Sequence, residues 1–118
     1  MQMTDKDILA KLDSCSASQL DSEDFGIVKM DHTGKVLEYN NTQSAFTGVL
    51  KNQSIGKNFF NEVAPCTNNF MVSNQYAANA SLDSSIDYTF TLKMKPTSVK
   101  LRLLKGPNTQ YLLCKKAS

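Results

Sequence analysis

The chain has 118 residues, a length that suits one domain with a single core. Its composition, 41% hydrophobic and 20% charged, is typical of a globular fold, and its net charge of +2 is dispersed apart from Lys115 and Lys116. This charge pattern argues against a nucleic-acid or membrane surface, no apolar run could span a bilayer, and the polar N-terminus lacks a signal core, so we expect a cytoplasmic protein.

The N-terminal segment predicts one short helix followed by a loop. Thr4 and Asp7 have the spacing of a capping box, and Ile8 and Leu12 then follow with the apolar spacing of an amphipathic helix. Residues 14–24 are polar and predict a loop with at most one turn.

The next segment predicts a hairpin and two short helices. The predicted elements are strands at 25–30 and 35–39, a turn at 31–34, and helices at 40–47 and 57–63. Asn40 is suited to cap the first of these helices and Gly48 to end it. The second stops before Pro65, because proline cannot continue a helix.

The last third predicts one helix and three strands. These are a helix at 70–80, with Phe70 and Tyr76 facing inward, strands at 86–94, 98–105 and 109–115, and turns at 95–97 and 106–108. Strands and helices that are segregated along the chain indicate an α+β fold. We therefore expect a five-stranded antiparallel sheet whose short helices cover one face and leave a pocket between helix and sheet.

Three cysteines are widely separated along the chain, and none belongs to a C-x-x-C pair. Free thiols are therefore expected rather than a zinc site or a redox dithiol. Cys114 lies in a predicted strand and suits a buried position, and Cys15 suits an incidental surface or cap position. Cys66 differs from both, because it follows Pro65 at the end of a short apolar helix, a setting that would fix its thiol for a covalently held cofactor.

Tyr39, Gln43 and Thr47 lie four residues apart and would form one stripe of hydroxyl and amide groups on a helix. Two interpretations remain open from the spacing. The stripe is either a helix face in contact with water or a cluster of donors for an anion buried under the helix.

Enzyme constellations are poorly supported, and we expect no enzymatic activity and no metal site. His32 is the only histidine, it lies in a predicted turn where a solvated position is expected, and nothing in the sequence places it beside Cys66. No glycine-rich phosphate loop is present either.

From about Asp7 to Lys115 the sequence resembles the photoactive yellow protein family, bacterial blue-light receptors of the PAS fold. The most specific match is the run from Ile55 to Phe60 followed by Val63-Ala64-Pro65-Cys66-Thr67. Further matches are Phe25-Gly26, Asp31, Gly34, Leu37, Tyr39-Asn40, Thr47-Gly48, Tyr88-Thr89-Phe90, Met94, Pro96-Thr97 and Val99-Lys100.

The resemblance implies a p-coumaric acid (4-hydroxycinnamic acid) chromophore, joined as a thioester to Cys66. Its phenolate oxygen would be held by Tyr39 and Gln43, with Thr47 supporting Tyr39, and its carbonyl by the backbone N–H of Cys66. The residues that match pocket-wall positions are Val28, Val63, Ala64, Phe90 and Met94. Three residues depart from the family pattern: Gln43 replaces glutamic acid, Val49 replaces an arginine over the ring, and Leu92 replaces a frequent tyrosine.

The resemblance also implies one PAS-type photosensor domain over residues 1–118, with an N-terminal helical cap at 1–24 and the core at 25–118. Light would isomerise the chromophore from trans to cis, the phenolate would gain a proton, the cap would loosen, and Met94 would assist recovery. We expect a monomer that acts on an unknown signalling protein, without nucleic acid or membrane. The main alternative is a PAS-like ligand-sensing or interaction module without a covalent chromophore, and a cysteine hydrolase is a weaker one.

Overall fold

The structure, a computed structural model, describes residues 1–90 and 96–117 of the chain. Leu92 and Met94, and the predicted end of a strand at residue 94, lie outside the described residues. No helix in the described part of the chain is long and apolar enough to cross a membrane.

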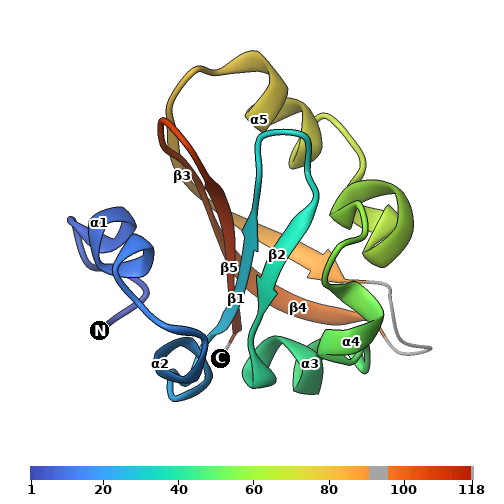
Figure 1. The fold of residues 1–118 in the computed structure, drawn as a ribbon. Coiled ribbons are helices and arrows are strands. Elements are labelled where there is room, and N and C mark those ends of the chain that lie inside the picture. Colours follow the sequence, from blue (N-terminus) through green and yellow to red (C-terminus); the bar gives the residue numbers. More distant parts are fainter. Residues whose placement is uncertain (91–95, 118) are drawn as a thin grey trace.

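A five-stranded sheet forms the centre of the molecule (Figure 1). The strands are β1 (Gly26–Met30), β2 (Val36–Tyr39), β3 (Leu82–Phe90), β4 (Thr97–Lys105) and β5 (Gln110–Lys116). Their order is β2-β1-β5-β4-β3, and every pair of neighbours is antiparallel. The predicted sheet is therefore confirmed.

β3 begins at Leu82, four residues before the predicted start at Ile86. The polar run Leu82-Asp83-Ser84-Ser85 hides the strand signal, but each of its residues pairs with β4, from Leu82 opposite Lys105 to Ser85 opposite Arg102. β3 lies at one end of the sheet, and its side chains alternate between half-buried and exposed.

Within residues 1–90 and 96–117, seven short helical segments surround the sheet. They are α1 (Ile8–Asp13), α2 (Ala17–Asp21), α3 (Asn41–Thr47), α4 (Lys51–Ser54), the π-helical turn η1 (Phe59–Val63), the 3₁₀ turn η2 (Pro65–Thr67) and α5 (Ser73–Ala78). As predicted, Asn40 caps α3 and Gly48, in the left-handed conformation with φ of 76°, ends it. The predicted helix at 57–63 is only the single turn η1, because the Asn58 side chain accepts from the N–H groups of Phe60 and Asn61 and so starts the turn there.

The other helices differ from the predictions in several respects. α2 replaces part of the predicted loop, because Ser16 and Gln19 form a reciprocal capping box, and no such box joins Thr4 to Asp7 at α1. α4 was not predicted, since its polar sequence has no apolar period. α5 begins only at Ser73, so Phe70 lies before it and is 74% exposed instead of facing inward, whereas Tyr76 is buried as predicted.

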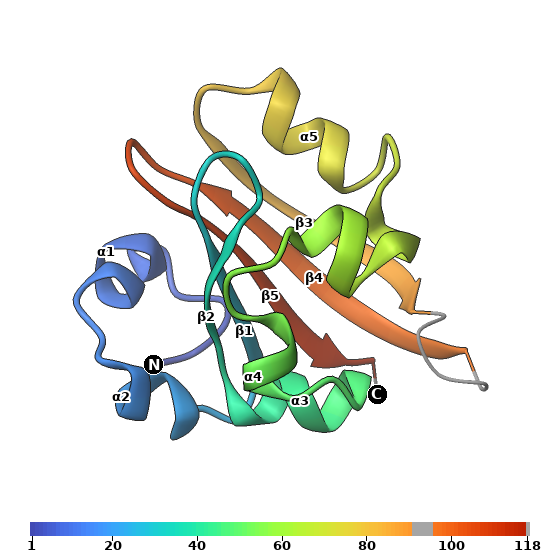
Figure 2. The same ribbon diagram turned by 45° about the vertical axis from the view of Figure 1, so that its right-hand side comes forward.

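Helices lie on both faces of the sheet and enclose two separate cores (Figures 1 and 2). On the first face, α3, α4, the η turns and α5 cover a core that includes Val28, Leu103 and Leu112. On the second face, α1 and α2 form the N-terminal cap over a core that includes Ile27 and Leu113. Successive residues of one strand thus serve opposite cores, as the alternation of strand side chains requires.

Two polar contacts tie the cap to the sheet. The Arg102 guanidinium donates to the backbone oxygens of Met3 at 2.8 Å and Asp5 at 2.7 Å, and it also forms a two-pronged pair with Asp83. The Asp13 carboxylate accepts from the Tyr111 hydroxyl at 2.6 Å. Both contacts join residues about a hundred positions apart in the chain.

At the other end of the sheet, the chain itself covers the start of β2. The Val36 N–H donates to the Lys57 oxygen at 2.9 Å, and the Gly56 N–H donates to the Val36 oxygen at 2.8 Å. The Phe59 N–H continues the series with the Gly34 oxygen at 2.8 Å. Gly34 and Gly56 both have positive φ, which suits these close turns.

Candidate functional site

The polar stripe of the sequence faces the first core and not the solvent. Tyr39 is the last residue of β2, and Gln43 and Thr47 follow on successive turns of α3. Their exposed fractions are 1%, 0% and 6%. The interpretation as a water-facing helix surface is therefore wrong, and the interpretation as a buried donor cluster agrees with this burial.

The three polar side chains form an incomplete hydrogen-bond network. The Tyr39 hydroxyl lies 2.6 Å from Thr47 Oγ1, and Thr47 Oγ1 lies 3.1 Å from the Gln43 backbone oxygen to which it donates. Since the Thr47 proton is used there, the Tyr39 proton points to Thr47. Both side-chain atoms of the Gln43 amide, Oε1 and Nε2, are buried without a hydrogen-bond partner. An unpaired buried amide costs free energy unless something binds to it.

Gly26 provides the space for this amide. A Cβ atom at position 26 would lie 2.0 Å from Gln43 Oε1 and 3.3 Å from the Gln43 Cα. Because position 26 of β1 has no side chain, α3 can approach the sheet closely enough to bury the Gln43 amide.

Burial raises the pKa of Tyr39 to about 12, and the hydrogen bond with Thr47 and the nearby Gln43 side chain only partly oppose this effect. The Tyr39 phenol consequently keeps its proton throughout the neutral range. It can act there as a hydrogen-bond donor.

Cys66 lies at the middle of η2, on the wall opposite the sheet. Pro65 precedes it at the first position of the turn, and Thr67 follows, with its N–H and hydroxyl both donating to the Ala64 oxygen at 2.9 and 2.7 Å. Pro65 therefore starts a turn of its own, and η1 has already ended at Val63. Cys66 is half-buried and its side chain packs against the first core.

The structure brings the predicted pocket residues together in that same core. Val28, Val63, Ala64 and Phe90 are buried members of it together with Tyr39, and Val28 lies directly opposite Tyr39 in the pairing of β1 with β2. Val49 and Cys66 are partly buried against this core. Met94 is among the residues that the structure leaves undescribed.

Tyr88 and Asn69 belong to the site, although sequence reasoning gave them no role. The Tyr88 hydroxyl donates to the Cys66 backbone oxygen at 2.6 Å, and the Asn69 amide nitrogen lies 3.1 Å from the same oxygen and 2.6 Å from the Tyr88 hydroxyl. A signal was present for Tyr88, because it lies two residues before Phe90 and so shares its face of the strand.

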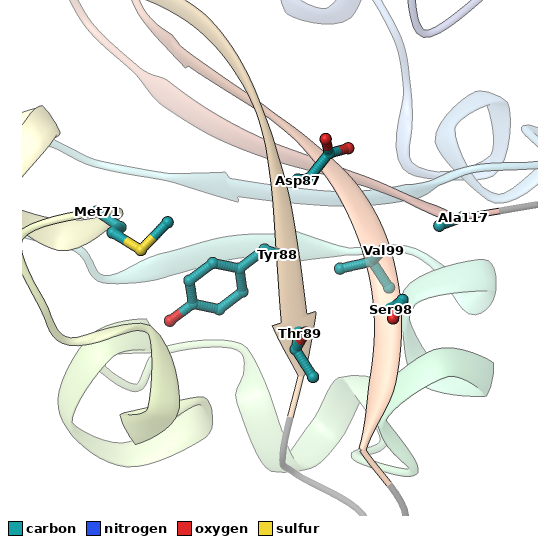
Figure 3. Close-up of a pocket in the computed structure, with 7 residues that line it drawn as sticks. All are labelled: Met71, Asp87, Tyr88, Thr89, Ser98, Val99 and Ala117. Atoms are coloured by element: carbon teal, nitrogen blue, oxygen red, sulfur yellow. The ribbon is translucent and has the colours of Figure 1, made fainter.

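An open groove of about 590 Å³ lies beside Tyr88 (Figure 3). Its lining residues are Met71, Asp87, Tyr88, Thr89, Ser98, Val99 and Ala117. Figure 3 shows the Tyr88 ring projecting from β3 to the side where Met71 lies.

Of the other two thiols, Cys114 is a buried member of the same first core and Cys15 lies beside the cap. Cys114 is buried in β5, as predicted, and burial raises its pKa to about 12. Cys15 donates to the Lys11 oxygen at 3.1 Å beside the cap. His32 is exposed, but its Nε2 lies 2.9 Å from the Gly106 oxygen, so it is less free than a solvated turn residue. Within the described residues, no group of three or more metal-binding side chains forms a possible metal site.

Comparison with known proteins identifies the class of the domain. Residues 17–105 match the PAS family, described by its PAS fold, and this range covers most of the chain. The central antiparallel sheet with short helices over the pocket face is thus that of a PAS domain.

Comparison with individual relatives assigns the chain to one family of PAS domains. Photoactive yellow protein from Halochromatium salexigens is 38% identical over 85% of this chain and 82% of its own length. Photoactive yellow protein from Rhodothalassium salexigens is 35% identical over 75% of this chain and 74% of its own length. The crystal structure of the photoactive yellow protein domain of the sensor histidine kinase Ppr from Rhodospirillum centenum has a TM-score of 0.84 and 29% identity, covering 91% of this chain and 98% of that domain. The chain belongs to the photoactive yellow protein family.

Proposed function

We propose that this protein is a blue-light photoreceptor that carries p-coumaric acid as a thioester on Cys66. One observation carries the proposal. The Gln43 amide is buried without a partner next to a buried Tyr39 hydroxyl, in the core against which the Cys66 side chain packs. The names of the relatives support the same conclusion.

The donor groups suit a phenolate oxygen. The amide Nε2 of Gln43 has a free proton to donate, and the Tyr39 hydroxyl can turn from Thr47 toward an anion. Thr47 would then turn its own proton from the Gln43 oxygen to Tyr39 Oη, since its hydroxyl lies within hydrogen-bond distance of both. Two donors to one buried oxygen would stabilise its charged form.

The remaining site residues attach and enclose the chromophore. The Cys66 sulfur would form the thioester bond, and Val28, Val63, Ala64 and Phe90 would exclude water from the ring. When bound, the group would supply absorption of visible light, trans–cis isomerisation and a phenolate that can gain a proton.

The donor cluster contains no group that is acidic enough to give up a proton near neutral pH. Gln43 has no acidic proton, and the pKa of Tyr39 is raised to about 12. Val49 adds no positive charge. A proton that reaches the site near neutral pH would therefore come from solvent and not from either of these two donors.

Signalling would pass through the N-terminal cap, because α3 contacts it directly. The Asn40 side chain donates to the Leu20 oxygen at 2.9 Å, and the Thr42 hydroxyl donates to the Glu23 oxygen at 2.7 Å. A change in the hydrogen bonds of Gln43 would thus act on the helix that holds the cap. The output would be a binding change toward a signalling protein rather than a catalysed reaction, in line with a relative that forms part of a sensor histidine kinase.

The test is to incubate the full chain with an activated ester of p-coumaric acid. A yellow product with one acyl group on Cys66, which bleaches under blue light and recovers in the dark, is the expected result. A colourless chain without added mass would favour the ligand-sensing or interaction module instead.

A further inference from the structure

We propose that Tyr88, supported by Asn69, is a positioning residue that aligns Cys66 for chromophore attachment by holding its backbone carbonyl. The role rests on the proposed function, because it concerns the thioester bond to Cys66. It assigns a function to two residues outside the predicted donor cluster and pocket walls.

Three hydrogen bonds connect Tyr88, Asn69 and the Cys66 oxygen in a closed triangle. Tyr88 donates to this oxygen at 2.6 Å, and the Asn69 amide nitrogen reaches the oxygen at 3.1 Å and the Tyr88 hydroxyl at 2.6 Å. Asn69 is itself fixed, since its side-chain oxygen accepts from the N–H groups of Met71 and Val72 at 3.0 and 3.1 Å.

The rest of the turn is already restrained on both sides of Cys66. Pro65 has a fixed φ, and Thr67 is bound to the Ala64 oxygen by two hydrogen bonds. The peptide group between Cys66 and Thr67 is held at both ends, because its N–H donates to the Ala64 oxygen and its carbonyl oxygen accepts from Tyr88 and Asn69. With this peptide fixed, the direction of the Cys66 Cα–Cβ bond is fixed too.

Because Tyr88 belongs to β3, the position of the Cys66 carbonyl is fixed by the sheet and not by the turn alone. Tyr88 lies in β3, where it pairs with Val99 of β4, and its ring packs edge-on against Phe90 with a centroid distance of 6.1 Å. Figure 3 shows the ring extending away from β3, with its hydroxyl at the far end. The sheet that carries the pocket wall Phe90 therefore also sets the position of the thiol.

Attachment is sensitive to this position. The Cys66 sulfur attacks the acyl carbon of an activated ester, the carbon–sulfur bond forms, the bond to the leaving group breaks with its electron pair, and the thiol proton goes to solvent. Such a bond-forming step depends on a narrow range of approach, and small misplacements slow it strongly. A small alkylating reagent has no pocket to fit and depends much less on the direction of the thiol.

The experiment compares two reactions of Cys66 in the chromophore-free full chain. Acylation by the activated p-coumaric ester and alkylation by iodoacetamide are each followed by mass spectrometry of the Cys66 peptide. In Tyr88→Phe we expect acylation to slow about tenfold while alkylation changes less than about twofold. Tyr76→Phe is the matched control, because it also removes a tyrosine hydroxyl that donates to a backbone oxygen, that of Tyr111 at 2.7 Å. It should leave both rates unchanged.

Asn69→Asp is a second variant, which keeps the side-chain oxygen that accepts from Met71 and Val72 but loses the donor to Tyr88. It should slow acylation as well, and it carries the test if Tyr88→Phe does not fold. Equal acylation rates for wild type and both variants, or parallel changes in acylation and alkylation, would overturn the positioning role and leave the proposed function intact. A wild-type chain that takes no acyl group on Cys66 would overturn both.

Discussion

In the proposed function, Gln43 and Cys66 would carry the chemistry of the site, and each has surroundings that set it apart in the chain. Gln43 is buried with an amide that has no partner. Cys66 lies between a proline and a doubly anchored threonine, whereas Cys114 is enclosed in a strand and Cys15 lies at the cap. These surroundings lead to two predictions about single residues.

Cys66→Ser should abolish chromophore attachment, because a serine hydroxyl is a much weaker nucleophile than a thiol. Cys15→Ser and Cys114→Ser should keep it, since Cys15 lies beside the cap and Cys114 is fully buried in β5 with its pKa raised to about 12, which keeps its thiol protonated. The measurement is the mass of each variant after incubation with the activated ester, together with its visible spectrum. A yellow Cys66→Ser protein would contradict covalent attachment at this residue.

Gln43→Glu should shift the dark absorption band of the holoprotein to the blue. Excitation moves negative charge away from the phenolate oxygen, so donors to that oxygen stabilise the ground state more than the excited state. A carboxylic O–H is a stronger donor than an amide N–H, and it would widen the energy gap. Absorption spectra of the two proteins test this directly, and an unchanged or red-shifted band would mean that Gln43 does not contact the phenolate.

The sequence singled out Gln43 and Cys66, but it did not decide whether the stripe is buried, and it gave Tyr88 no role. Burial of the stripe could not be decided from spacing, because the same four-residue interval fits a helix face in water. The observed burial agrees with the cluster that the resemblance implies, but Gln43 fits between α3 and the sheet because of Gly26, a residue of a different element. Tyr88 was overlooked for a related reason, since its contact with Cys66 joins residues 22 positions apart and leaves no periodic signal.

Among the elements, α3 connects the candidate site to the cap. The contacts of its N-cap residue, Asn40, set the position of the helix. Asn40 accepts from the N–H groups of Gln43 at 3.0 Å and Ile27 at 2.9 Å. It also donates to the oxygens of Leu20 and Phe25 at 2.9 and 3.0 Å. One buried side chain thus joins the helix, the first strand and the cap.

Asn40→Ala should destabilise the protein by about 2–4 kcal/mol, which exceeds the roughly 1 kcal/mol of an ordinary helix cap. The excess arises because four buried backbone groups lose their partner. Urea unfolding of the two chromophore-free proteins measures the difference. Asn40→Asp is the control, because it keeps the acceptor for the two N–H groups and loses only the two donations. A loss no larger than that of a surface cap would contradict the connecting role.

Prediction from sequence succeeded best for elements with two agreeing signals. α3 had an N-cap and a terminal glycine, and the strands β1, β2 and β5 had apolar alternation or runs between turns. α2 and α4 are too short and polar to show a period, so only side-chain capping reveals them. The start of β3 was hidden because its first four residues obtain their strand geometry from pairing with β4.

For the whole molecule, the placement of two cores on opposite faces makes the cap a separate layer that polar contacts hold on the sheet. Arg102 is only 7% exposed, and its Nη1 donates to two backbone oxygens of the N-terminal segment. Its pairing with Asp83 holds the pKa of that carboxyl below its usual value and orients the guanidinium.

Arg102→Gln should therefore loosen the first residues of the chain while the sheet stays folded. Hydrogen bonds to a charged donor contribute about 1.5–3 kcal/mol, so we expect at least about tenfold faster trypsin cleavage after the exposed Lys6. Amide hydrogen exchange of α1 should speed up in parallel. Lys100→Gln, which removes an exposed partner of Asp87, is the control and should not change cleavage. Equal cleavage in both variants would show that apolar packing alone holds the cap.

Alkaline pH should destabilise the whole protein. Burial raises the pKa of Tyr39 and of Cys114 to about 12, and it also raises the pKa of Tyr76 and Tyr111. Free tyrosine and cysteine ionise near ~10 and ~8.5, so the unfolded chain releases protons that the folded chain keeps. The free energy of unfolding should fall as pH rises from about 8.5 to 12, by at most ~1.4 kcal/mol per pH unit for each group.

The measurement is urea unfolding of the chromophore-free protein at intervals across that range. Cys114→Ala removes the group with the lowest unfolded-state pKa, so its stability should decline less steeply between about pH 8.5 and 10. Parallel curves for wild type and variant would contradict a protonated thiol in β5.

The two ends of the sheet differ in a way that affects how copies of the protein meet in concentrated solution. At the start of β2 the backbone groups of Val36 are satisfied by the Gly56–Phe59 segment, whereas no strand of the described chain pairs with the outer side of β3. A strand from a second molecule could extend the sheet along β3. Exposed Asp83 and Asp87, at alternate outward positions, would have to lose water for that to happen. The charges of Asp83 and Asp87 would thus oppose the addition of a strand to β3.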